Sequence, residues 1–166
     1  MSVSLLEYFR SGPPAPPVVL LPDAHFFVRA VPVVDAKTPD EVAAQVGLAL
    51  ETLAPFPLAQ LNHGFFWTAG SGHALAFAAY RRRFPIEQTA SWAGAELVIP
   101  SFVTVCGQQV APSTTVLLPG PDSLTAVHWG NGAVPDNVRV CPLPAEATDE
   151  DRSRVRAELL REVGES

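Results

Sequence analysis

Cysteine is scarce in this sequence. Cys106 and Cys141 are its two cysteines, and they lie in separate segments without a Cys-x-x-Cys spacing. This pattern argues against a disulfide framework and against a metal or redox site built from cysteines. We therefore expect two buried thiols in a reducing compartment.

Positive charge is also scarce, since 11 Lys and Arg stand against 17 Asp and Glu, a net charge of −6. Nucleic acids and anionic membrane surfaces are bound by clustered basic faces, so we expect neither as the main partner. One basic run, residues 81–83, follows a predicted strand. We interpret it as a solvated strand end rather than a phosphate site.

Long apolar runs and a secretion signal are missing. The first ten residues lack a basic start, and no window approaches the ~18 apolar residues of a membrane-spanning helix. We expect a cytoplasmic protein without direct membrane insertion, peripheral to the inner membrane only through a partner.

Apolar residues are plentiful, at 48% hydrophobic against 17% charged. This composition predicts a folded chain with its own core. Residues 12–17 contain four prolines and favour an extended linker. We predict an N-terminal arm and linker at 1–17, an α/β domain at 18–111, and a small β-meander with a helix at 112–166. One interpretation of residues 112–166 is an incomplete second lobe.

The first predicted helix has the clearest boundaries. Thr38, Pro39 and Glu41 form a capping-box sequence with proline at the first helical position. Apolar residues then recur at helical spacing, so we predict a helix from Thr38 to about Leu53 that buries Val42, Val46 and Leu50. Pro55 and Pro57 end it.

Strands and shorter helices account for most of the remaining chain. The predicted strands are 18–21, 25–34, 61–68, 74–80, 96–99, 114–118, 124–129 and 138–140, and the predicted helices begin at Pro85 and Thr148. The glycine turn at 70–72 predicts a hairpin, whose second strand is apolar on both faces. The whole predicts an α/β fold with a mixed sheet flanked by helices.

One series of segments within residues 18–107 is distinctive. It contains the strands 18–22 and 28–32, the helix ending at Glu51, the Pro-Phe-Pro-Leu corner at 55–58, and the segments 76–80 and 92–100. In these segments the chain resembles the actin-like scaffold proteins of type IV pilus assembly (PilM) and of type II secretion (GspL). The resemblance implies a ribonuclease-H/actin-like fold and a non-catalytic cytosolic scaffold that docks another pilus or secretion component at the inner membrane. It also implies a groove for a short peptide.

The nucleotide site of actin-like ATPases is not visible. Such enzymes use two Asp-x-Gly loops, in which backbone amides meet phosphate and the aspartate orients the metal. The turn at 119–123 has its glycine and aspartate in the wrong order and is an ordinary turn by sequence. We predict no cofactor. The alternative is a degenerate or truncated actin-like ATPase whose loops lie on another chain.

Other catalytic or metal sites find little support. The four histidines, His25, His63, His73 and His128, lack the spacing that puts two ligands on one face, so no metal is predicted. A Ser101, His128, Asp122 triad lacks a Gly-x-Ser-x-Gly elbow, and Cys106 with His63 is a weaker pairing. A hydrolase on an unrecognised α/β fold is a third interpretation, and no catalytic residue is predicted.

Aromatic doublets mark candidate binding surfaces. Adjacent strand residues point to opposite faces, so Phe26 and Phe66 lie in doublets that are either covered on both faces or leave an apolar patch for a partner. Coverage is the favoured interpretation. The remaining partner-binding candidates are the arm residues Leu5, Leu6, Tyr8 and Phe9, which could occupy a groove in the same or a neighbouring molecule or form a frayed end.

Overall fold

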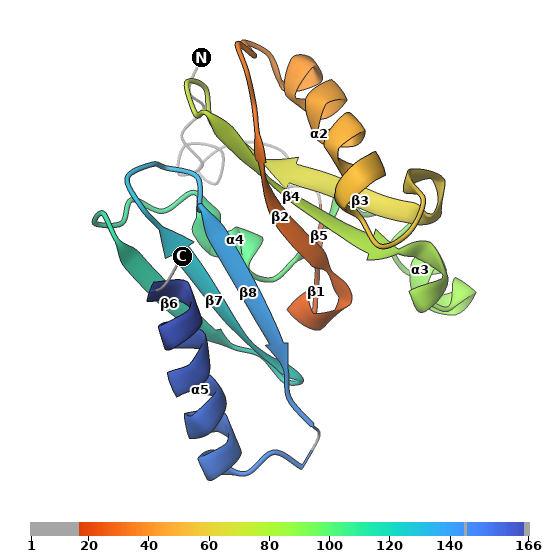
Figure 1. Ribbon diagram of the computed structural model, residues 1–166. Helices are drawn as coiled ribbons and strands as arrows, with labels where there is room; N and C mark the ends of the chain where they lie inside the picture. The colour runs from red at the N-terminus through yellow and green to blue at the C-terminus, as the bar shows by residue number, and fades with distance from the viewer. Residues whose placement is uncertain (1–16, 145, 165–166) are drawn as a thin grey trace, which may run out of the picture.

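A computed structural model of the protein describes residues 17–144 and 146–164. The chain is a mixed α/β protein, and its described strands form three small sheets (Figure 1). One sheet is parallel and two are antiparallel. A meander separate from the main sheet was expected and is present. The strands of residues 18–111 form two sheets and not one mixed sheet, so that part of the expectation is wrong. The ribonuclease-H/actin-like arrangement stays a prediction.

The parallel sheet, here called the β1–β5 ribbon, contains two short strands. β1 (Val18–Leu21) pairs with β5 (Leu97–Pro100), with Val18 opposite Leu97. After β1, Pro22 and the 3-10 turn η1 (Asp23–His25) redirect the chain. This turn is the reason for the separate sheets, because β2 starts beyond it in a new direction and pairs elsewhere.

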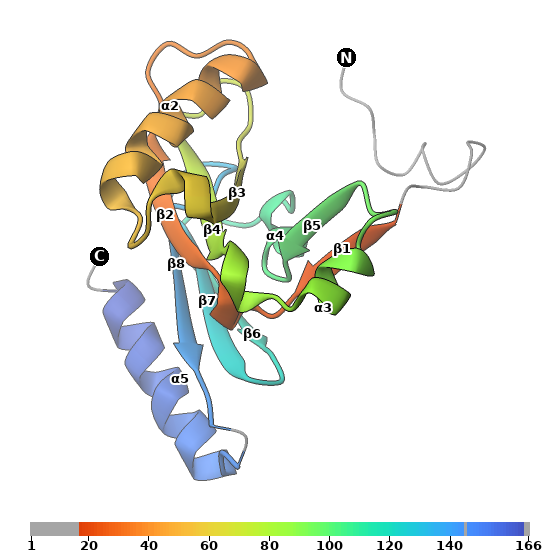
Figure 2. The same cartoon turned by 90° about the vertical axis from the view of Figure 1, so that its right-hand side faces the viewer.

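The second sheet contains β2 (Phe27–Pro32), β3 (Leu61–Phe66) and β4 (His73–Tyr80), with β4 in the centre. The predicted hairpin of β3 and β4 is confirmed, and residues 74–79 are buried as expected for a strand covered on both faces. The helix α2 (Pro39–Leu53) covers one face of this sheet (Figure 2).

The predicted start and buried stripe of α2 are also confirmed. The Thr38 hydroxyl accepts a hydrogen bond from the Glu41 amide at 3.3 Å, and the Glu41 carboxylate accepts one from the Thr38 amide at 3.3 Å. Both contacts satisfy amides that the first helical turn leaves without partners. Val42, Val46 and Leu50 are fully buried against the sheet.

The third sheet is the predicted meander, formed by β6 (Thr114–Pro119), β7 (Ser123–Trp129) and β8 (Asn137–Pro142). The helix α5 (Asp149–Gly164) buries Leu159 and Val163 against it. The apolar cluster that joins the second and third sheets includes Phe77 and Trp129. This cluster connects the two predicted parts of the chain, and the division at residue 112 stays a prediction.

Short 3-10 and α-helices complete the fold. They are η2 (Leu58–Gln60), η3 (Arg81–Arg83), α3 (Ile86–Ala90) and α4 (Val103–Cys106). At the corner after α2, the Phe56 ring stacks on Tyr80 with 4.4 Å between centroids. In the part of the chain that the structure describes, no helix is both long and apolar enough to cross a membrane.

Candidate functional site

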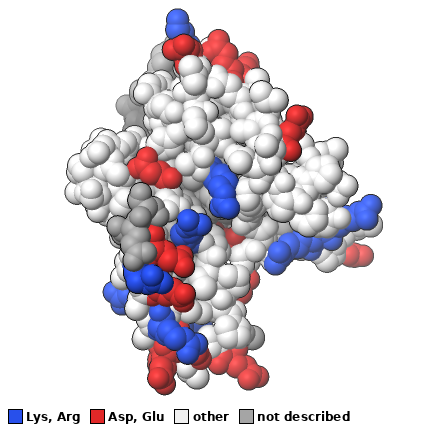
Figure 3. Space-filling view, in the orientation of Figure 1, with Lys and Arg blue, Asp and Glu red and all other residues white. Residues whose placement is uncertain are grey.

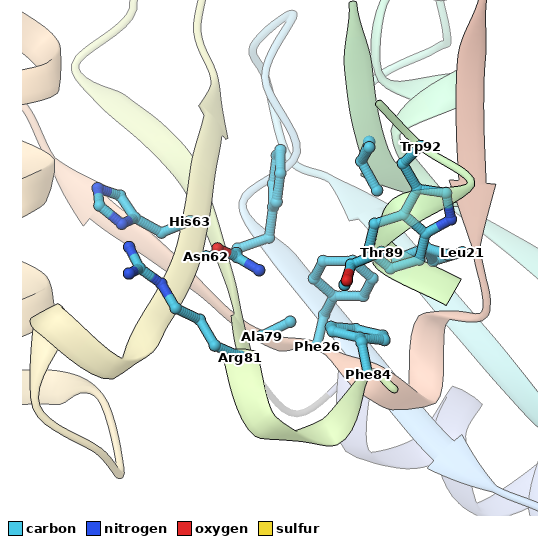
Figure 4. Close-up of a pocket in the computed structure, with 11 residues that line it drawn as sticks. Leu21, Phe26, Asn62, His63, Ala79, Arg81, Phe84, Thr89 and Trp92 are labelled. Carbon is cyan, nitrogen blue, oxygen red and sulfur yellow. The ribbon is translucent and has the colours of Figure 1, made fainter. Parts of the chain in front are cut away.

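A groove lies between the β1–β5 ribbon and the hairpin of β3 and β4. In Figure 2 the ribbon projects to one side of the other two sheets, with α3 beside it. The cavity has a volume of about 490 Å³. Its lining residues, most of which Figure 4 labels, are Leu21, Phe26, Asn62, His63, Phe77, Ala79, Arg81, Phe84, Thr89, Trp92 and Val98.

Aromatic rings form the apolar part of the groove. Phe84 and Trp92 meet edge to face with 5.2 Å between centroids, and Phe26 and Phe77 do so at 6.1 Å. Phe77 and Phe84 are each 6% exposed, whereas Trp92 and Phe26 are half-buried. Edge-to-face contacts fix ring orientation, so the groove offers a formed apolar surface before any ligand arrives.

Polar side chains occupy the rim. Asn62 and His63 are exposed on β3, Arg81 follows β4, and Thr89 lies on α3 across the opening (Figure 4). The Arg81 Nε donates to the Leu61 carbonyl at 2.9 Å, which ties the guanidinium to the start of β3. The rim thus supplies donors and acceptors around an apolar floor.

Basic charge gathers at the same end of the molecule. Arg81, Arg82 and Arg83 are all exposed in η3, as expected for a solvated strand end. Figure 3 shows Lys and Arg atoms beside the position of α3 in Figure 1, while much of the neighbouring surface carries neither charge. The groove therefore opens next to a positive rim.

A buried carboxylate fixes the ribbon behind the groove. Asp23, 6% exposed, accepts a hydrogen bond from the Phe102 amide at 3.0 Å and one from the Thr125 hydroxyl at 2.7 Å. Burial raises the pKa of Asp23, and these hydrogen bonds partly oppose the rise. Asp23 links η1, α4 and β7, and its importance was missed from the sequence, where Pro22-Asp23 read as an ordinary turn.

The predicted partner-binding residues have different positions. Phe26 lines the groove, whereas Phe66 packs against the cluster between the second and third sheets. Leu5, Leu6, Tyr8 and Phe9 lie outside the described residues. A binding role for any of the six stays a prediction. Phe84, Trp92 and Asn62 were not anticipated, and only the aromatic character of Phe84 and Trp92 gave a signal.

The residues considered for catalysis have other structural partners. The Ser101 hydroxyl donates to the Leu21 carbonyl at 3.0 Å, and His128 Nδ1 lies 2.9 Å from the Thr115 hydroxyl. No hydrogen bond joins Ser101, His128 and Asp122, all of which the structure describes. Cys106 is fully buried, and burial raises the pKa of its thiol to about 12, so it is held as an unreactive thiol.

The histidines sit in separate environments. His25 packs edge to face on Phe84 at 5.5 Å, and burial lowers its pKa. His73 Nε2 lies 3.1 Å from the Pro135 carbonyl and 3.5 Å from an Asp136 oxygen. Within residues 17–144 and 146–164, no group of three His, Cys, Asp or Glu side chains could hold a metal ion.

Comparison with known proteins gave limited results. No protein-family model matches the chain, and no curated protein matches it. Among solved structures, it is similar to the cytoplasmic domain of EpsL, an inner membrane component of the type II secretion system of Vibrio cholerae. The identity is 13% and the TM-score 0.49, over 75% of this chain and 50% of that one. The chain thus spans half of that domain's length, and the likeness is loose.

Proposed function

We propose that this protein is a non-catalytic scaffold domain whose groove binds a short segment of another protein. The observation that carries the proposal is the groove's aromatic floor under a polar rim. The resemblance of residues 18–107 to PilM and GspL proteins supports a partner from a type IV pilus or type II secretion assembly, at the cytoplasmic face of the inner membrane. The ribonuclease-H/actin-like arrangement belongs to the same proposal.

The chemistry of the lining suits a peptide. Binding energy at protein interfaces concentrates in buried aromatic and arginine side chains, and Phe84, Trp92 and Arg81 meet in this groove. Asn62 can donate and accept hydrogen bonds, as a peptide backbone requires, and the Thr89 hydroxyl, which donates to the Ile86 carbonyl at 2.9 Å, can still accept one. The outer edge of β3 adds to this, because β3 pairs only with β4 among the described strands.

The same lining is poorly suited to acid–base catalysis. His63 and Arg81 are the ionisable side chains among the lining residues. Arginine does not serve as a proton donor or acceptor in catalysis, so the lining offers one histidine and no carboxylate for proton transfer. A proton relay needs a second such group, which favours binding over catalysis.

Selection from a displayed peptide library tests the binding function. We expect enrichment of peptides with two or more large apolar residues, and we expect Thr89→Trp to abolish binding because the new ring fills the groove. Gln88→Trp is the matched control, since Gln88 is exposed on α3 and does not line the groove. Affinities are read from the fluorescence anisotropy of dye-labelled peptides, with folding checked by thermal melts. Equal binding to both variants would place the site elsewhere.

The alternative function is a truncated actin-like ATPase, and it has a separate test. Without Asp-x-Gly loops we expect no heat when ATP and magnesium are titrated into the protein in a calorimeter. A dissociation constant near micromolar, about −8 kcal/mol, needs a formed phosphate site. Such a value would favour the ATPase over the scaffold.

A further inference from the structure

We propose that the groove of one copy takes residues 5–9 of a second copy, so that two chains associate by exchanging N-terminal arms. The proposal rests on the proposed peptide-binding function and names the occupant. It is supported by the composition of residues 5–9, by the charge of the rim, and by the direction in which the chain leaves β1.

The apolar content of the arm matches the groove. Four of the residues at 5–9 are large and apolar, namely Leu5, Leu6, Tyr8 and Phe9. The volume of about 490 Å³ falls within the range of roughly 300–1,000 Å³ typical of small-ligand sites. It can hold a few side chains but no folded domain. Aromatic rings of the arm would meet an aromatic floor, where edge-to-face contacts add to burial.

The charges are complementary. Glu7 is the one charged residue within residues 5–9. Arg81 and His63 lie on the rim, and Arg82 and Arg83 are exposed beside it. No Asp or Glu is among the described lining residues. Among these lining side chains, a carboxylate carried by the bound segment would therefore meet only positive or neutral groups, which fixes register and speeds encounter.

The direction of the chain favours a second molecule over the same one. The Pro17 carbonyl accepts a hydrogen bond from the Glu96 amide at 3.0 Å, so the extended path of β1 continues to Pro17. Residues 12–17 favour polyproline II, in which six residues at about 3.1 Å each span about 19 Å. Leu21, which lines the groove, is at the opposite end of β1. An arm returning to its own groove would have to turn back against the direction in which Pro17 leaves the ribbon.

Apolar side chains are also exposed at the base of the arm, on the face of the ribbon opposite Leu21 and Val98. Val18 and Leu20 are each 48% exposed and Leu97 is 51% exposed, all on the β1–β5 ribbon. Reciprocal exchange of arms closes into a two-fold dimer, in which each chain supplies one arm and one groove. We therefore expect a dimer rather than an open chain of molecules.

The test uses three full-length variants and sedimentation velocity. One variant carries Leu6→Asp with Phe9→Asp in the arm, one carries Thr89→Trp in the groove, and Gln88→Trp is the control. We expect the wild type and the control to be dimers and the other two to be monomers. A mixture of the arm and groove variants should form a 1:1 complex, because one has an intact groove and the other an intact arm.

A synthetic peptide of residues 1–12 separates this proposal from the general function. We expect it to bind the arm variant at least about tenfold more tightly than it binds Thr89→Trp. We also expect its affinity for the arm variant to fall as the salt concentration rises. If library peptides bind the groove but the arm peptide does not, the exchange is overturned and the peptide-binding function stands. If neither the library peptides nor the arm peptide binds the groove, the exchange of arms and the peptide-binding function are both overturned. A monomeric wild type that excludes the peptide, while the arm variant binds it, would show docking within one chain and would also overturn the exchange.

Discussion

The two sheets that meet at the groove are built in opposite ways. The sheet of β2, β4 and β3 has α2 on one face and the meander against the other, and residues 74–79 of its central strand are buried. The β1–β5 ribbon has two strands of four residues, and Val18, Leu20 and Leu97 remain about half exposed. We call the sheet of β2, β4 and β3, which is covered on both faces, the frame. The β1–β5 ribbon is only partly covered.

This difference shows how a small protein can present apolar surface without losing its core. A two-stranded sheet is only marginally stable alone. Polar contacts hold the ribbon at its carboxyl end. Asp23, which follows β1, accepts from the Phe102 amide, and the Ser101 hydroxyl, which follows β5, donates to the Leu21 carbonyl. Stability therefore comes from the frame, and the ribbon can expose side chains to a partner.

The largest expected effect is a charge placed in the frame. Val46→Asp puts a carboxylate on the fully buried face of α2. An unpaired buried charge is strongly disfavoured, so we expect a loss of about 4 kcal/mol or more in unfolding free energy. Leu20→Asp on the ribbon should cost about 1 kcal/mol or less, because the side chain is half exposed.

Chemical denaturation followed by circular dichroism measures both variants, in dilute solution so that association does not contribute. A similar loss for Val46→Asp and Leu20→Asp would show that the ribbon is as covered as the frame. The comparison between the two sheets would then be incorrect.

An intermediate effect is expected where Asp23 joins the ribbon to the meander. Asp23→Ala leaves the Phe102 amide and the Thr125 hydroxyl buried without their acceptor. Each lost acceptor costs about 1–3 kcal/mol, so we expect a loss of about 2–4 kcal/mol in unfolding free energy. Asp40→Ala is the control, since Asp40 is exposed in the first turn of α2.

A double-mutant cycle with Thr125→Val isolates the contact between the two side chains. Because the Asp23 carboxylate and the Thr125 hydroxyl are in direct contact, the two substitutions should not be additive. Additive losses would show that Asp23 does not join the sheets through Thr125.

The sequence predicted what depends on neighbouring residues. Thr38, Pro39 and Glu41 identified the start of α2, and helical spacing identified Val42, Val46 and Leu50 as buried. The glycine turn before β4 and the turns of the meander likewise identified strand pairs that are close in sequence. Helix caps, turns and hydrophobic periodicity depend on residues a few positions apart, so they can be predicted from the sequence alone.

Contacts between residues far apart in the sequence could not be predicted from it. The pairing of β1 with β5 separates it from β2, and the sequence offers no rule that chooses this arrangement over one mixed sheet. Asp23 and Thr125 are 102 residues apart. The groove exists only because β1, β3, η3 and α3 converge, so Phe26 was named as a candidate but Trp92 was not.

The smallest expected effect is a change in how stability depends on pH. The folded pKa of Asp23 is raised by burial, so the folded protein binds this proton more tightly than the unfolded chain does. Its contribution to stability is fully present below the unfolded pKa, near 3.9, and is lost as pH rises through the folded pKa. Asp23→Asn removes this titration while keeping an oxygen that accepts from Phe102 and an amide that donates to Thr125.

Thermal melts of both proteins from acid to neutral pH measure the difference. We expect the melting temperature of Asp23→Asn, relative to the wild type, to rise as pH increases and then to level off above the folded pKa of Asp23. Taking the difference cancels the other carboxylates, which titrate alike in both proteins. A relative melting temperature that instead fell with pH would mean that the folded pKa lies below the unfolded one. The hydrogen bonds to Phe102 and Thr125 would then outweigh burial, and Asp23 would join the meander to the ribbon as a stabilised charge.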